Sequence, residues 1–133
     1  MAVGALATGL YTRCFGHEAE EWAVELLLAS GAEVRPGSYR EDCILKVDFW
    51  VRNCRRWLPV QFSVDRRRLC GEKGMDCLRR GVIPSYLPAE KLEEWASGRD
   101  SRLQKELVSQ FWKQVEAVLA GFPKLRLLEP AWR

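Results

Sequence analysis

Two consecutive segments rich in β-branched and aromatic residues constrain the fold of this chain more than any other feature. They span residues 43–51 and 57–64, and a basic connection at residues 52–56 separates them. Such a composition is typical of strands, and so short a connection favours an antiparallel hairpin. The sequence therefore predicts a two-stranded hairpin near the middle of the chain.

Polar side chains interrupt this hairpin where an apolar sheet face is expected. Asp48 lies between Val47 and Phe49 on the first segment, while Gln61 and Ser63 alternate with apolar neighbours on the second. Because successive strand residues point to opposite faces, Gln61 and Ser63 share one face. A buried carboxylate is usually paired, metal-bound or at a strand end. One face of the hairpin is therefore expected to present Asp48, Gln61 and Ser63 together.

Helices are predicted on both sides of this hairpin. Residues 16–30 carry apolar side chains at three- and four-residue spacing, and Gly31 is placed to end that helix. The other expected elements are a short strand at 32–35, a basic helix at 66–80 capped by Asp65, a strand at 81–88, a helix at 89–97, a helix at 100–119 capped by Asp100, and an edge segment at 124–133. Strands flanked by helices predict the α/β class, with a central mixed β-sheet.

The size and composition of the chain are those of one globular domain. Its 133 residues are 47% hydrophobic and carry a net charge of +3, so we expect a single domain over residues 1–133. Residues 1–11 lack a basic leader and are soon followed by charges, so no targeting or transmembrane segment is expected. Five cysteines without a CxxC pair, and one histidine, His17, argue against a zinc site and favour a cytoplasmic protein with reduced thiols.

Positive charge is concentrated in one part of the chain. Residues 52–80 contain nine Lys and Arg against three acids, whereas residues 18–42 are mainly acidic. A basic region in a nearly neutral chain indicates an anionic partner such as nucleic acid. The alternative is a solvated helix face, and composition alone favours that alternative.

The helix predicted at residues 16–30 and the glycine after it carry an acid, a small residue three positions later, a leucine and a glycine: Glu20, Ala23, Leu27 and Gly31. In this spacing the segment resembles the opening helix of the restriction-endonuclease-like nucleases, the superfamily with the PD-(D/E)xK motif. The small archaeal-type Holliday junction resolvases are the members that it resembles most. The similarity covers roughly residues 16–86 and rests on the order and spacing of short motifs.

The same superfamily continues with an aspartate on the second strand and an acid-x-lysine motif on the third. Asp48 matches the aspartate, Gln61 stands at the second acid, and Ser63 stands at the lysine. The resemblance implies a restriction-endonuclease-like sandwich, Mg²⁺ as the cofactor, cleavage of DNA phosphodiester bonds, with branched DNA as one candidate substrate, and a homodimer. The candidate catalytic residues are Glu20, Lys46, Asp48, Gln61 and Ser63; the candidate metal ligands are Glu20, Asp48, Gln61 and the carbonyl of Phe62; the candidate nucleic-acid-binding residues are Arg55, Arg56, Arg66, Arg67 and Arg68.

Two of these positions depart from the superfamily pattern. Gln61 supplies an oxygen ligand but no charge, and Asp42 is a further acid that would compensate. The hydroxyl of Ser63 cannot replace an ammonium group, so a cation would have to come from Lys46, or from Arg66 or Arg67. A catalytically inactive relative, which binds nucleic acid or another protein, therefore stays open beside the nuclease. Each of these residues taken alone also has an ordinary structural interpretation, such as pairing of Asp48 with Lys46.

Overall fold

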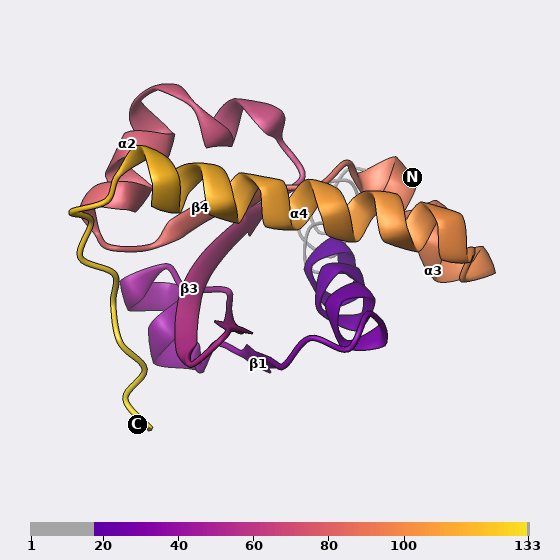
Figure 1. Cartoon of the computed structure of the whole chain (residues 1–133), viewed down its shortest axis with the longest axis horizontal. Coiled ribbons are helices and arrows are strands. Elements are labelled where there is room, and N and C mark those ends of the chain that lie inside the picture. The colour runs from indigo at the N-terminus through magenta and orange to yellow at the C-terminus, as the bar shows by residue number, and fades with distance from the viewer. Residues whose placement is uncertain (1–17, 133) are drawn as a thin grey trace, which may run out of the picture.

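A four-stranded mixed sheet forms the centre of the protein in the computed structural model, which describes residues 18–132 (Figure 1). The sheet order is β1-β2-β3-β4; the pairs β1–β2 and β2–β3 are antiparallel, and β4 runs parallel to β3. The strands are β1 (Val34–Pro36), β2 (Phe49–Asn53), β3 (Arg56–Ser63) and β4 (Ile83–Tyr86). The predictions of an α/β class, a mixed sheet and a central hairpin are confirmed.

The prediction of a strand over residues 43–51 is wrong in its first part. Glu41–Leu45 is a π-helical turn, η1, and β2 begins only at Phe49. Ser38 and Glu41 start this turn, because the Ser38 amide donates to the Glu41 carboxylate at 2.8 Å and the Glu41 amide donates to the Ser38 hydroxyl at 3.1 Å. Lys46 ends it in a left-handed conformation, with φ 60°. These local hydrogen bonds outweigh the strand propensity of residues 43–45.

The predicted basic helix at residues 66–80 is divided. A 3₁₀ turn, η2 (Arg66–Leu69), is followed by the helix α2 (Gly71–Arg79). Gly71 has φ +72°, a conformation that glycine adopts without strain, and this position changes the direction of the chain. A Cβ atom at Gly74 would lie 2.5 Å from the carbonyl oxygen of Leu69, so this glycine allows η2 to pack directly on α2.

The other helices follow the sequence closely. They are a helix at residues 18–29, α3 (Ala89–Gly98) and α4 (Ser101–Gly121). The Asp100 carboxylate accepts from the Leu103 amide at 3.0 Å, which confirms the predicted cap of α4. Gly31 follows the first of these helices with φ 93°, as a terminating glycine should.

Helices cover both faces of the sheet. The larger core lies between one face and the helices 18–29, α3 and α4, and Figure 1 shows α4 crossing in front of β3. The smaller core lies on the opposite face, where Trp50 of β2 and Val47 meet Cys77 of α2 and Val82. Neighbouring residues of β2 therefore belong to different cores: Phe49 and Val51 face the larger core, and Trp50 faces the smaller one.

The C-terminal segment follows the sheet without adding a strand to it over residues 122–132. The Leu128 amide donates to the Gly81 carbonyl at 2.9 Å. The ring of Trp132 packs edge-on against Trp50 and Trp57, with centroids 5.3 Å and 5.7 Å away. Within the part of the chain that the structure describes, no helix has the length and apolar composition needed to cross a bilayer. The predictions made for residues 1–17, including His17, lie outside the described residues.

Candidate functional site

Asp48 occupies the position directly before β2, where three backbone contacts fix it. Its amide donates to the Val60 carbonyl at 2.8 Å, although Val60 is the register partner of Phe49, so Asp48 is held beside the end of the β2–β3 ladder and adds no regular step to it. Its carbonyl accepts from the Gly37 amide at 2.8 Å, and its carboxylate oxygen Oδ2 accepts from the Phe62 amide at 2.6 Å. The side chain is thus held against the end of β3, and Asp48 precedes β2 instead of lying inside the strand predicted over residues 43–51.

Burial and neighbouring acids raise the pKa of Asp48 to about 8. The largest cause is the loss of hydration on burial; the negative charge of Glu20 and a hydrogen bond with the Asp42 side chain add to it, while the Phe62 amide acts in the opposite direction. A carboxyl group with such neighbours either keeps its proton at neutral pH or gives it up to a bound cation.

Glu20, Asp42 and Asp48 line one cavity, of about 380 Å³, which we call the acidic cavity. They come from three different parts of the chain: the helix at residues 18–29, η1, and the position directly before β2. No group of three or more His, Cys, Asp or Glu side chains among residues 18–132 is arranged to hold a metal ion by itself. Mg²⁺, however, needs only one or two carboxylates, because it keeps several water ligands.

The backbone of Phe62 faces the same side of β3 as Asp48. The N–H and C=O groups of one strand residue point to the same neighbouring strand. The Phe62 amide contacts the Asp48 carboxylate, so the Phe62 carbonyl faces that side too. The Phe62 carbonyl, a candidate metal ligand from the sequence, is therefore compatible with a metal ion bound beside Asp48.

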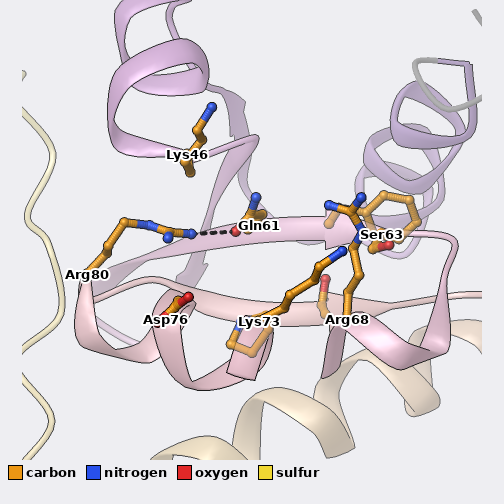
Figure 2. Close-up of a pocket in the computed structure, with 10 residues that line it drawn as sticks. Lys46, Gln61, Ser63, Arg68, Lys73, Asp76 and Arg80 are labelled. Carbon is orange, nitrogen blue, oxygen red and sulfur yellow. Dashed lines mark hydrogen bonds between the residues drawn. The ribbon is translucent and has the colours of Figure 1, made fainter. Parts of the chain in front are cut away.

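A second cavity, of about 260 Å³, lies along β3 on the side of α2, and we call it the basic pocket (Figure 2). Arg68 of η2 and Lys73 of α2 extend towards Ser63, and Arg80 lies beside Gln61. Lys46 borders the pocket from across β3, with its amino group directed away from Gln61. The complete lining is Lys46, Gln61, Phe62, Ser63, Arg68, Lys73, Asp76, Arg80, Pro84 and Ser85.

Gln61 is already engaged by a cation of this pocket. Its side-chain oxygen accepts from the Arg80 guanidinium at 2.9 Å. The acid of the pocket, Asp76, accepts from Arg79 at 2.8 Å. The structure therefore brings Gln61 and Ser63 together with cations, and it brings Asp48 and Glu20 together with Asp42.

The predicted arginines fall in three different places. Arg68 lines the basic pocket, whereas Arg66 and Arg67 do not; Arg67 instead pairs with the capping residue Asp65 at 3.1 Å. Arg55 and Arg56 lie at the β2–β3 turn, at the opposite end of β3 from Ser63. Arg56 and Ser63 are the first and last residues of β3, seven steps of strand apart, which is roughly 23 Å.

Five residues that line the basic pocket were not predicted as site residues: Lys73, Asp76, Arg80, Pro84 and Ser85. Lys73 and Arg80 are seven residues apart, so two turns of helix place them on one face of α2 and its C-cap. That spacing could have identified them. The sequence could not identify Ser85 in this way, because nothing in the predicted strand 81–88 marks its serine as a pocket residue until the neighbouring elements are known.

The four cysteines of the described chain are free thiols. Cys43, Cys54 and Cys70 are exposed, and Cys77 lies on the buried side of α2. Burial raises the pKa of the Cys77 thiol to about 11, and the charge of Asp48 contributes in the same direction. Asp48 is therefore near enough to α2 for its charge to act on Cys77.

The acidic cavity and the basic pocket thus meet at the same end of the β2–β3 hairpin, because Phe62 lines the basic pocket and its amide binds the Asp48 carboxylate of the acidic cavity. Comparison of the chain with protein-family models, curated proteins and solved structures found no match.

Proposed function

We propose that this protein is a Mg²⁺-dependent nuclease of the restriction-endonuclease-like type, acting on DNA. One observation carries the proposal: Asp48, held by Phe62 and grouped with Glu20 and Asp42, lies next to a pocket lined by cations. The order of the elements supports it, because a helix precedes three antiparallel strands and the polar residues stand where the second begins and the third ends.

The acidic cavity suits a hard divalent cation. Its donors are carboxylate oxygens, and the raised pKa of Asp48 indicates negative charge that a cation would relieve. A bound Mg²⁺ would supply a water of lowered pKa and stabilise charge on the phosphate. Asp48 and Glu20 are the residues that would hold it, with the Phe62 carbonyl alongside.

Cations from α2 and η2 take the place of the missing lysine at Ser63. Lys73 and Arg68 both extend towards this residue, so a phosphate group at the end of β3 would meet positive charge there. Their role is to bind and orient the phosphate, which strengthens charge stabilisation in a confined site. Lys46, by contrast, has its amino group directed away from this point.

The test is cleavage of supercoiled plasmid and of four-way-junction DNA with Mg²⁺ or Mn²⁺. We expect Asp48→Asn to reduce the cleavage rate by more than about 100-fold, since it removes the central charged ligand. Glu116→Gln, an exposed carboxylate on α4, is the matched control and should cleave as the wild type does. Cleavage that persists in Asp48→Asn contradicts the proposal.

The contact between Arg80 and Gln61 favours a second candidate, a nucleic-acid-binding module without catalysis. A guanidinium on the Gln61 oxygen places positive charge where a metal ligand is expected. This candidate predicts no cleavage by the wild type with either metal, together with DNA binding whose affinity falls steeply as salt increases. Cleavage by the wild type, abolished in Asp48→Asn, excludes it.

A further inference from the structure

The basic pocket has more positive charge than its own acids can neutralise. Arg68, Lys73 and Arg80 all line it, and none of them forms an ion pair with another residue of the described chain. Asp76 also lines the pocket, but its carboxylate is bound to Arg79. Cations gathered in this way repel one another unless an anion lies between them.

A buried hydroxyl without a partner lines the same pocket. Ser85 is 1% exposed, and its Oγ atom forms no hydrogen bond within residues 18–132. Leaving a buried polar group unsatisfied costs about 1–3 kcal/mol, so such a group usually meets a ligand or water. Two independent features of this cavity, its cations and the hydroxyl, thus indicate a ligand that accepts hydrogen bonds.

The size and charge of the pocket narrow the class of this ligand. At about 260 Å³, the cavity is close to the lower limit of small-molecule sites, roughly 300 Å³. An internal phosphodiester carries one negative charge. A phosphate monoester carries about −1.5 to −2 at pH 7 and has three strong acceptor oxygens. Arg68 and Lys73 near Ser63, with Arg80 beside Gln61, provide three cationic donors, two of them arginines, and these match the monoester better.

We propose that the basic pocket is a binding site for a phosphate monoester, as found at the phosphorylated end of a nucleic-acid strand or on a free nucleotide. Arg68 and Lys73 bind the phosphate oxygens near Ser63, and Arg80 binds from the side of Gln61. The inference rests on the proposed function in one respect, since it takes nucleic acid as the source of the phosphate. A strand end held here would lie beside the acidic cavity.

The experiment is a binding measurement in EDTA, where no cleavage takes place. Fluorescence anisotropy compares one labelled oligonucleotide with a 5′-phosphate, a 3′-phosphate or hydroxyl ends. Inorganic phosphate and a nucleoside monophosphate serve as competitors. We expect a phosphorylated end to bind at least about tenfold tighter than hydroxyl ends, or the free nucleotide to bind and compete; the first result identifies strand ends as the ligand, and the second identifies nucleotides.

Three variants locate the binding. Arg68→Ala and Lys73→Ala remove exposed side chains, so the fold should be retained and the phosphate preference lost. Ser85→Ala should weaken phosphate binding while the melting temperature stays equal or rises, because an unsatisfied hydroxyl is removed. Arg102→Ala, an exposed arginine on α4 outside the pocket, is the charge-matched control and should bind as the wild type does.

Equal affinity for phosphorylated and hydroxyl ends, together with no binding of the free nucleotide, overturns the inference. A phosphate preference that survives both Arg68→Ala and Lys73→Ala overturns it as well, because the phosphate would then bind elsewhere. Neither result depends on catalysis: a protein that never cleaves DNA can still show the phosphate preference, and a nuclease can lack it.

Discussion

The acidic cavity and the basic pocket lie on either side of the same strand end, yet the chain builds them differently. In the acidic cavity, the backbone fixes the central group: the Phe62 amide holds the Asp48 carboxylate, and Gly37 holds its carbonyl. In the basic pocket, long side chains from η2 and α2 converge over Gln61 and Ser63. The first site is set by strand pairing, and the second by the packing of two short helical segments.

This difference has a consequence for substitutions. A change in strand packing should disturb the acidic cavity and spare the basic pocket, whereas a change between η2 and α2 should do the reverse. Four substitutions, taken from the largest expected effect to the smallest, test whether the acidic cavity and the basic pocket respond independently.

Gly37→Ala should damage the acidic cavity most. A Cβ atom at this position would collide with the Val47 carbonyl oxygen and lie 3.1 Å from the Asp48 carbonyl oxygen, so the backbone must move. We expect a loss of about 2–3 kcal/mol in the free energy of unfolding, measured by chemical denaturation. Phosphate binding in EDTA should persist under native conditions. Loss of both stability and phosphate binding would show that the two cavities are not separable.

Gly74→Ala should act on the basic pocket instead. The added Cβ would lie 2.5 Å from the Leu69 carbonyl oxygen, which pushes η2 away from α2. We expect a loss of about 1–2 kcal/mol and weaker phosphate binding, while Mg²⁺ binding stays intact. Gly98→Ala is the control, because nothing lies within 4 Å of its Cβ position; it should leave stability unchanged or raise it slightly. Equal losses of stability in Gly74→Ala and Gly98→Ala would contradict this explanation.

Asp48→Asn should stabilise the protein in a pH-dependent manner. Because the pKa of Asp48 rises from 3.8 to about 8 on folding, the unfolded chain loses this proton at lower pH than the folded chain does. The Asp48 carboxyl therefore makes its full contribution to the free energy of unfolding below about pH 4, and this contribution falls as the pH rises towards 8. Asparagine does not ionise. The free energy of unfolding of the variant should therefore equal that of the wild type near pH 4 and exceed it by about 1–2 kcal/mol at pH 8, a difference that solvent screening reduces.

Thermal melts of both proteins from pH 4 to pH 9 measure this difference. Added Mg²⁺ should raise the melting temperature of the wild type at pH 8, because a cation replaces the proton, and should not raise that of the variant. A constant difference between the two proteins across the pH range would show that the carboxyl group does not titrate as stated.

Lys46→Gly should have the smallest effect and should be favourable. Lys46 adopts φ 60° and ψ 37°, which costs a residue other than glycine roughly 1 kcal/mol, so the variant should melt a few degrees higher. Since the amino group is directed away from Gln61, phosphate affinity should change less than about threefold. A loss of phosphate affinity as large as that in Lys73→Ala would show that the Lys46 side chain turns into the basic pocket when phosphate binds.

Strand composition and helix periodicity were sufficient to predict the sheet and most of the helices. Asp48 was expected at the hairpin because its neighbours are apolar, and the caps Asp65 and Asp100 were recognised from their positions before helices. η1 could not be predicted in this way, since it depends on a hydrogen-bond exchange between Ser38 and Glu41 and on Trp50, whose indole donates to Glu41 at 3.1 Å.

The candidate site was predictable only in part, for a geometrical reason. Strand pairing alone predicts that Asp48, Gln61 and Ser63 lie on one face of the hairpin, but Asp48 lines the acidic cavity, whereas Gln61 and Ser63 line the basic pocket. The grouping of Asp42 with Asp48 depends on η1, and the arrival of Lys73 at Ser63 depends on the chain reversal at Gly71. Contacts of this kind involve tertiary packing, which a residue pattern does not specify.

The outer edge of the sheet bears on how copies of this chain can associate. β1 has only three residues and ends in Pro36, which has no amide hydrogen to donate. The guanidinium of Arg35 lies 4.8 Å from the ring centre of Trp132 and 5.7 Å from that of Trp57. A second chain therefore finds few free backbone groups at this edge, so β1 resists edge-to-edge aggregation. A homodimer would have to form through another surface, such as the exposed side of α4.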